Sequence, residues 1–155
     1  MSSRRAGFTF IEMLIVMIVL GVLASLAVLK YIDLKNRALT AQASSDMDAV
    51  RLAAYSTWYE TGSWPTEVGA GVLPAEMAPY LAKGFTFSRP EYTLDYENLT
   101  PPGGGPSASM QIGVIISSTN PRMQLALEQT LGNKGPYFIT GSDVTFVIVG
   151  PDGQS

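Results

Sequence analysis

The sequence contains neither cysteine nor histidine. Their absence excludes disulfide bonds, thiol nucleophiles and imidazole general bases, and it removes the usual ligands of structural zinc. It leaves the compartment open, because a protein outside the cytoplasm needs no disulfide if its core is large enough. No pair of nucleophile and general base can be assigned from the other residues. The sequence therefore predicts a protein that is not an enzyme, with no catalytic residue and no cofactor.

Charged residues are also scarce, at 15% of the chain, against about 25% in an average soluble domain. Ten basic residues stand against 13 acidic ones, which gives a net charge of −3. No cluster of basic residues is interleaved with aromatic ones. Because contacts with phosphate groups need local positive charge, we expect no direct binding of nucleic acid.

The shortage of charge is concentrated in residues 8–29, where Glu12 is the single charged residue. As a helix this stretch spans about 33 Å, enough to cross a bilayer core of about 30 Å. Arg4 and Arg5 precede it, so the positive-inside rule places the N-terminus in the cytoplasm and the chain after Lys30 on the far side. A cleaved secretory signal fits poorly, since its apolar region normally runs about 7 to 15 residues. A plain signal anchor fits the length well.

Against a plain anchor stands Glu12, because a carboxylate in an apolar span costs up to about 3 kcal/mol at the bilayer centre. Such a residue usually has a partner and a function. The residues before it add a second signal. A short hydrophilic leader, residues 1–7, ends in Gly7, and the apolar stretch then begins with Phe8 and Thr9.

These features resemble the N-terminus of the type IV pilin-like family, which comprises type IV pilins and the pseudopilins of type II secretion systems. The resemblance covers residues 4–31. It implies that a prepilin peptidase cleaves between Gly7 and Phe8, and that Phe8 is then N-methylated. It also implies that Glu12 serves subunit assembly by pairing with the terminal amine of a neighbouring subunit. The implied partners are the other subunits of a homo- or hetero-oligomeric filament, the peptidase and an inner-membrane assembly platform.

Two departures from the family bear on which system the chain serves. Leu29 stands where many pilins have a helix-weakening proline, and no cysteine pair closes the C-terminal loop as in many type IV pilins. We therefore expect a type II secretion pseudopilin, anchored by a single span in the bacterial inner membrane and assembled into an extracytoplasmic filament. A major or minor type IV pilin is the first alternative. A single-pass anchored domain that binds a ligand is the second.

The helix is predicted to continue to Thr61, because residues 30–61 lack proline and glycine and are rich in helix-forming residues. Apolar residues at spacings of three and four form one stripe, which consists of Leu39, Ala43, Met47, Val50, Ala54 and Trp58. Gly62 ends the helix and Pro65 prevents its resumption. This amphipathic half is expected to pack on the sheet that follows.

The remaining chain predicts a small antiparallel sheet, and so an α+β fold compatible with that of pilins. Strands are expected at residues 85–88, 92–97, 110–117, 137–140 and 144–149. Short helices are expected at residues 73–81, and from Asn120-Pro121 to Leu131 before Gly132. The PPGGGP sequence of residues 101–106 predicts a loop. The expected organisation is a leader (1–7), a transmembrane and assembly helix (8–29) and an extracytoplasmic pilin-like domain (30–155).

The densest group of acidic residues is Glu91, Asp95 and Glu97. Alternation along a strand places all three on one face, which we expect to be solvated. Near the C-terminus only Asp143 and Asp152 are acidic, so the Ca²⁺-binding loop of many major pseudopilins is not carried over to this chain. The sequence therefore predicts no metal site.

Overall fold

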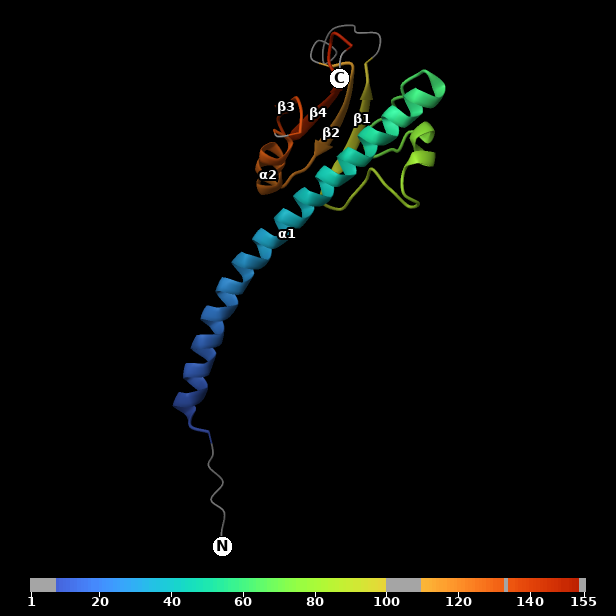
Figure 1. The fold of residues 1–155 in the computed structure, drawn as a ribbon. Coiled ribbons are helices and arrows are strands. Elements are labelled where there is room, and N and C mark those ends of the chain that lie inside the picture. The colour runs from blue at the N-terminus through green and yellow to red at the C-terminus, as the bar shows by residue number, and fades with distance from the viewer. Residues whose placement is uncertain (1–7, 100–109, 133, 154–155) are drawn as a thin grey trace. The chain divides into compact units, whose positions relative to one another are not determined.

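The computed structural model describes residues 8–99, 110–132 and 134–153. The chain divides into two compact units, Met1–Asn36 and Arg37–Ser155. Helix α1 (Phe10–Thr61) begins in the first unit and ends in the second. The second unit then contains, in chain order, the 3₁₀ helix η1 (Ala75–Tyr80), β1 (Thr93–Asn98), β2 (Ile112–Ser117), α2 (Pro121–Leu131), β3 (Tyr137–Thr140) and β4 (Asp143–Val149) (Figure 1).

The first part of α1 buries nothing within the chain. Every residue from Phe8 to Lys35 is exposed, and the most apolar 18-residue window of the helix has a mean hydropathy of 2.7 with no part of it buried. By length and composition the helix can cross a membrane. An apolar surface of this extent needs a cover outside the monomer, either lipid or other protein.

The second part of α1 packs on the sheet along the predicted stripe. Ala43, Met47, Val50 and Ala54 have no exposed surface, whereas Leu39 is only partly buried. The stripe prediction is therefore confirmed over its middle and wrong at Trp58, which is 39% exposed.

The predicted end of α1 is confirmed as well. The helix stops at Thr61. Gly62 follows with a φ of 76°, and its N–H donates to the Trp58 carbonyl at 2.8 Å. This left-handed conformation suits glycine and ends a helix by bonding one of its last carbonyls.

The sheet is antiparallel, with the strand order β1-β2-β4-β3. One face of it, the second part of α1 and the inner side of α2 share a single hydrophobic core (Figure 1). The strand residues in this core are Leu94, Tyr96, Ile112, Val114, Ile116, Val144, Phe146, Ile148 and Val149, and the α2 residues are Met123, Leu127 and Leu131. The predicted α+β class and antiparallel sheet are confirmed.

The start of α2 follows the sequence prediction closely. The Asn120 Oδ1 accepts hydrogen bonds from the backbone N–H of Arg122 at 3.2 Å and of Met123 at 3.4 Å. Pro121 occupies the first turn, where no N–H is needed. The closing hairpin around Gly141 is also confirmed, and Gly141 takes a φ of 62°.

Two predicted elements differ from the structure. Residues 85–88 form no strand; Ser88 makes only an isolated bridge to Thr93. The Thr86 hydroxyl accepts from the Ser88 N–H and donates to the Ser88 carbonyl, so a local turn competes with strand pairing. The predicted helix at 73–81 is a 3₁₀ helix over Ala75–Tyr80 that contains Pro79, which has no N–H to extend an α-helix. The predicted PPGGGP loop lies outside the described residues.

Removal of the chain through Leu29 should leave a soluble, folded monomer, because the deleted residues bury nothing in the described structure. Circular dichroism and size-exclusion chromatography would test this. A matched deletion through Val50 removes Ala43, Met47 and Val50 from the core and should unfold the remainder, since each large apolar side chain contributes about 1.5–3 kcal/mol. An insoluble or unfolded product from the shorter deletion would contradict the independence of this core.

Candidate functional site

A reciprocal hydrogen-bonded cap forms the start of α1. The Thr9 hydroxyl accepts from the backbone N–H of Glu12 at 3.3 Å. In return, the Glu12 Oε2 accepts from the Thr9 N–H and from the Thr9 hydroxyl, both at 2.8 Å. This arrangement is a capping box, which satisfies two N–H groups that a helix start otherwise leaves without a partner. The Glu12 carboxylate also lies in the first turn, where the helix dipole favours negative charge.

Thr9 is a functional candidate that the sequence interpretation missed. The signal was present, because a threonine followed three residues later by glutamate before an apolar run is the sequence signature of a capping box. The sequence prediction for Glu12 named only a partner in another subunit and not Thr9. Glu12 therefore has one structural role inside its own chain, in addition to any role between chains.

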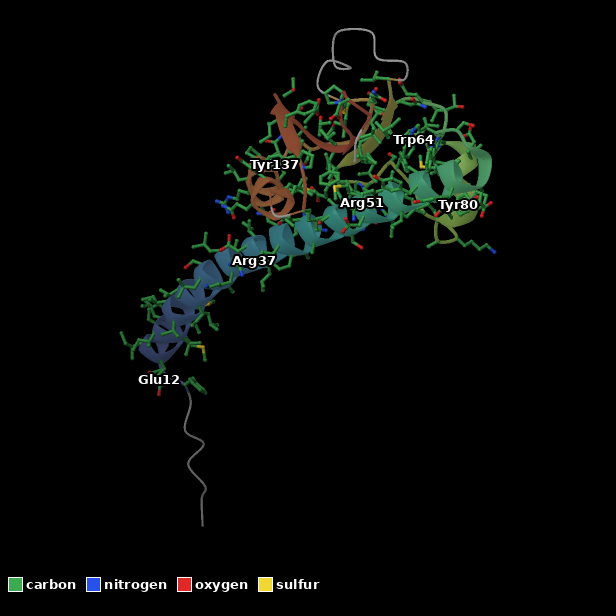
Figure 2. All side chains as sticks on the ribbon, turned by 45° about the horizontal axis from the view of Figure 1, so that its top comes forward. Glu12, Arg37, Arg51, Trp64, Tyr80 and Tyr137 are labelled. Carbon is green, nitrogen blue, oxygen red and sulfur yellow. The ribbon has the colours of Figure 1, made fainter. Side chains whose placement is uncertain are left out.

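The predicted site residues share one short segment. Phe8 is 75% exposed and Glu12 is exposed one helical turn further on, at the start of α1 (Figure 2). Gly7 lies outside the described residues. The exposed Glu12 carboxylate is accessible to a cation from another chain, while both hydrogen bonds from Thr9 go to its Oε2.

A second group of acidic side chains differs from its predicted setting. Asp95 and Glu97 are half-buried rather than fully solvated, and they are joined by Glu67, which comes from the segment between α1 and η1. Burial, the charges of Glu67 and Asp95 and a hydrogen bond with Glu67 raise the pKa of Glu97 from 4.5 to about 7. In the described part of the chain, no group of three or more acidic side chains is placed to hold a metal ion.

Aromatic side chains gather where α1 ends. Trp58 and Trp64 stack with their ring centroids 5.7 Å apart, and Tyr55 meets Trp64 edge-on at 5.5 Å. A pocket of about 310 Å³ lies beside these rings and is lined by Tyr55, Trp58, Tyr59, Trp64, Gln111, Val149 and Gly153. The two tryptophans thus pack against each other.

A second pocket, of about 250 Å³, lies beside the turn at Pro90. Its one arginine, Arg89, is held by Asp46, with its Nη2 2.9 Å from the Asp46 Oδ2. The Ser118 hydroxyl in its wall donates to the Glu91 carbonyl at 2.9 Å. These polar groups bond to one another and connect the turn to α1 and to the end of β2.

Comparison with known proteins places the N-terminal segment in a family context. A family profile described as the prokaryotic N-terminal methylation motif matches residues 2–28. The chain is similar to the type II secretion system core protein G of Dickeya chrysanthemi, with 31% identity over 110 residues, which is 65% of this chain and 72% of that protein. It is also similar to the type IV major pilin protein PilE1 of Neisseria gonorrhoeae, with 33% identity over 72 residues, 46% of this chain and 34% of that pilin. No solved structure matches the chain significantly.

Replacement of Thr9 by valine keeps the side-chain shape and removes the hydroxyl of the cap. We expect the first turn of α1 to open more readily, by about 1 kcal/mol, as for other lost N-caps. Amide exchange of residues 10–13 in detergent micelles would measure this. Ser25→Ala is a suitable control, because the Ser25 hydroxyl only donates to the Val22 carbonyl within the helix. First-turn exchange that is unchanged in Thr9→Val would argue against a working capping box.

Proposed function

The chain belongs to the type IV pilin-like family, which includes the type II secretion core protein G to which it is similar over most of its length, and we propose that it is a structural subunit of a pilus-like filament. The observation that carries this proposal is the start of α1, where the apolar and exposed first part of the helix begins with a capped carboxylate. An anchor alone needs the apolar helix but not the charge. A filament subunit uses both.

Lipid is the first of two environments that could bury the apolar part of α1. In the proposed pathway, residues 8–29 span the bacterial inner membrane before assembly, and residues 30–155 form the extracytoplasmic domain. Arg4 and Arg5 in the leader, residues 1–7, support this orientation by the positive-inside rule. Every described residue before Asn36, from Phe8 to Lys35, is exposed, which supports a long exposed segment of this kind.

Contact with the helices of other subunits is the second environment that could bury the apolar part of α1. Cleavage between Gly7 and Phe8 by a prepilin peptidase would create an amine at Phe8, which N-methylation leaves cationic. The Glu12 carboxylate of a neighbouring subunit would then pair with it as the assembly platform adds subunits. In surroundings of low dielectric constant such a pair is stronger than at a solvated surface, although desolvation offsets part of the gain.

The pseudopilin interpretation is favoured over that of a type IV pilin. The similarity to the secretion protein extends over 72% of that protein, whereas the similarity to the gonococcal pilin covers 34% of the pilin. The chain also has no cysteine to close a C-terminal disulfide loop. We therefore propose a type II secretion system as its setting, with a type IV pilus as the alternative.

Processing is tested by replacing Gly7 with leucine. If Gly7 is the residue before the cut, the variant should accumulate as the precursor, while the parent protein extracted from membranes should begin at methylated Phe8. Intact-mass analysis distinguishes the two forms. Ser3→Leu makes the same kind of change elsewhere in the leader and should be processed normally. An uncleaved parent protein in cells with an active prepilin peptidase would contradict the proposed site.

The role of Glu12 is tested with Glu12→Gln and Glu12→Val. Both variants should still insert into the membrane, and valine should insert at least as well as glutamate because it removes a polar group from the span. Filament yield in a sheared fraction should fall about tenfold or more, because loss of about 1.4 kcal/mol changes an equilibrium tenfold. Thr9→Val is the matched control, since it removes the cap and keeps the charge.

The two roles of Glu12 predict different outcomes for this control. If Glu12 serves assembly through its charge, Thr9→Val should retain most of the filament yield. An equal loss in Thr9→Val and Glu12→Val, with Glu12→Gln still assembling, would show that capping alone explains the effect, because glutamine can also close a capping box. An equal yield from Glu12→Val and the parent would exclude the assembly role, as a plain membrane anchor predicts.

A further inference from the structure

The segment that links α1 to η1 lies along the free edge of the sheet. We call residues 65–71 the connector. At its start the Pro65 carbonyl accepts from the Asn98 side-chain amide at 2.7 Å, and at its end the Gly71 N–H donates to the Leu94 carbonyl at 2.8 Å. Since β1 is an edge strand of the sheet, the connector covers backbone groups of β1 that another strand could otherwise pair with.

The connector brings a carboxylate to two carboxylates of β1. Glu67 lies between the two attachment points, and its charge acts on both Asp95 and Glu97. These two residues share the face of β1 that points away from the core, whereas Leu94 and Tyr96 point into it. The Asp95 Oδ1 is buried and has no hydrogen-bond partner.

The carboxyl cluster consists of Glu67, Asp95 and Glu97. Among the described residues, no cation contributes to the pKa shifts of Asp95 and Glu97. On the neighbouring strand β2, the residues paired with Asp95 and Glu97 are Ile115 and Gly113, which carry no charge. From β4, Asp143 adds a further negative charge that acts on Asp95. Every charged side chain that shifts the pKa of Asp95 or of Glu97 is acidic. Full ionisation of the cluster therefore places like charges on both sides of the contact between connector and strand.

Protonation relieves this repulsion. Burial, like charge and the hydrogen bond with Glu67 raise the pKa of Glu97 to about 7, and burial and the charge of Glu67 raise that of Asp95. With the connector undocked, the pKa of Glu97 would lie nearer its ordinary value of 4.5. The docked state is thus favoured most below about pH 4.5, and it loses this advantage as the pH rises from about 4.5 to about 7.

We propose that the connector is a pH-sensitive clasp on the edge of β1, held against the strand while Glu97 carries a proton beside Glu67 and Asp95, and loosened when that proton is lost. The backbone is suited to such a movement, because Gly69 and Gly71 take φ values of 95° and 77° that few other residues adopt. Loosening breaks the hydrogen bonds that join the connector to the Leu94 carbonyl and to the Asn98 side chain, and it exposes this edge of the sheet. This property is independent of the proposed filament role.

Hydrogen exchange of the full-length protein in detergent micelles tests the clasp. Protection of residues 66–72 is measured between pH 5 and pH 8 and corrected for the intrinsic pH dependence of exchange. In the parent protein it should fall at least tenfold, because each unit of the raised pKa of Glu97 corresponds to a factor of ten. Glu97→Gln should keep protection at pH 8 within about twofold of its value at pH 5, and Glu67→Gln should show a clearly smaller fall than the parent, because burial still raises the pKa of Glu97.

Glu128→Gln, on α2, removes one negative charge away from the connector and should show the same fall as the parent. Glu67 is exposed, so Glu67→Gln decides the question even if Glu97→Gln unfolds, which circular dichroism would reveal. Parent protection that is the same at pH 5 and pH 8 would overturn the proposal. So would a fall in Glu67→Gln as large as that in the parent.

Discussion

One constraint governs this protein: a single helix has to satisfy two different surroundings. Residues 10–35 of α1 are apolar apart from a few positions and bury nothing in their own chain, whereas from Ala43 to Ala54 the same helix supplies one wall of the core. The first stretch is stable only under lipid or against other subunits. The second is stable because the sheet covers it. The proposed membrane anchoring, the expected independent folding of the outer domain and the proposed assembly through helix packing all rest on this division.

Glu12 connects these surroundings through its charge. In the monomer its carboxylate is held by the backbone and hydroxyl of Thr9, which offsets part of the cost of a polar group at the start of an apolar helix. A cationic amine from a neighbouring subunit is a stronger partner for a carboxylate than a neutral hydroxyl, because it adds the attraction between two opposite charges to the hydrogen bond. In the proposed filament, the cap would therefore keep Glu12 oriented and hydrogen-bonded until that amine arrives. In this scheme the sequence Phe8-Thr9 supplies both the intermolecular and the intramolecular partner of the same carboxylate.

Local signals in the sequence predicted local structure well. Asn120-Pro121 at the start of α2 and Gly62 after α1 set the ends of these helices through their own chemistry, as predicted. The prediction of a strand at 85–88 was wrong, because the Thr86 hydroxyl bonds the local backbone. The approach of Glu67 to Glu97 could not be predicted, since it depends on the path of the connector along a strand distant in sequence. The Thr9–Glu12 cap was predictable and was overlooked.

The most direct test of the central claim is a high-resolution cryo-electron microscopy map of the assembled filament. Intersubunit pairing predicts the methylated Phe8 nitrogen within about 4 Å of a Glu12 carboxylate from a neighbouring subunit, the usual limit for an ion pair. It also predicts that residues 8–29 are covered by the same segment of other subunits. A filament in which Glu12 contacts only its own Thr9, and the Phe8 amine has no neighbouring carboxylate, would contradict the claim.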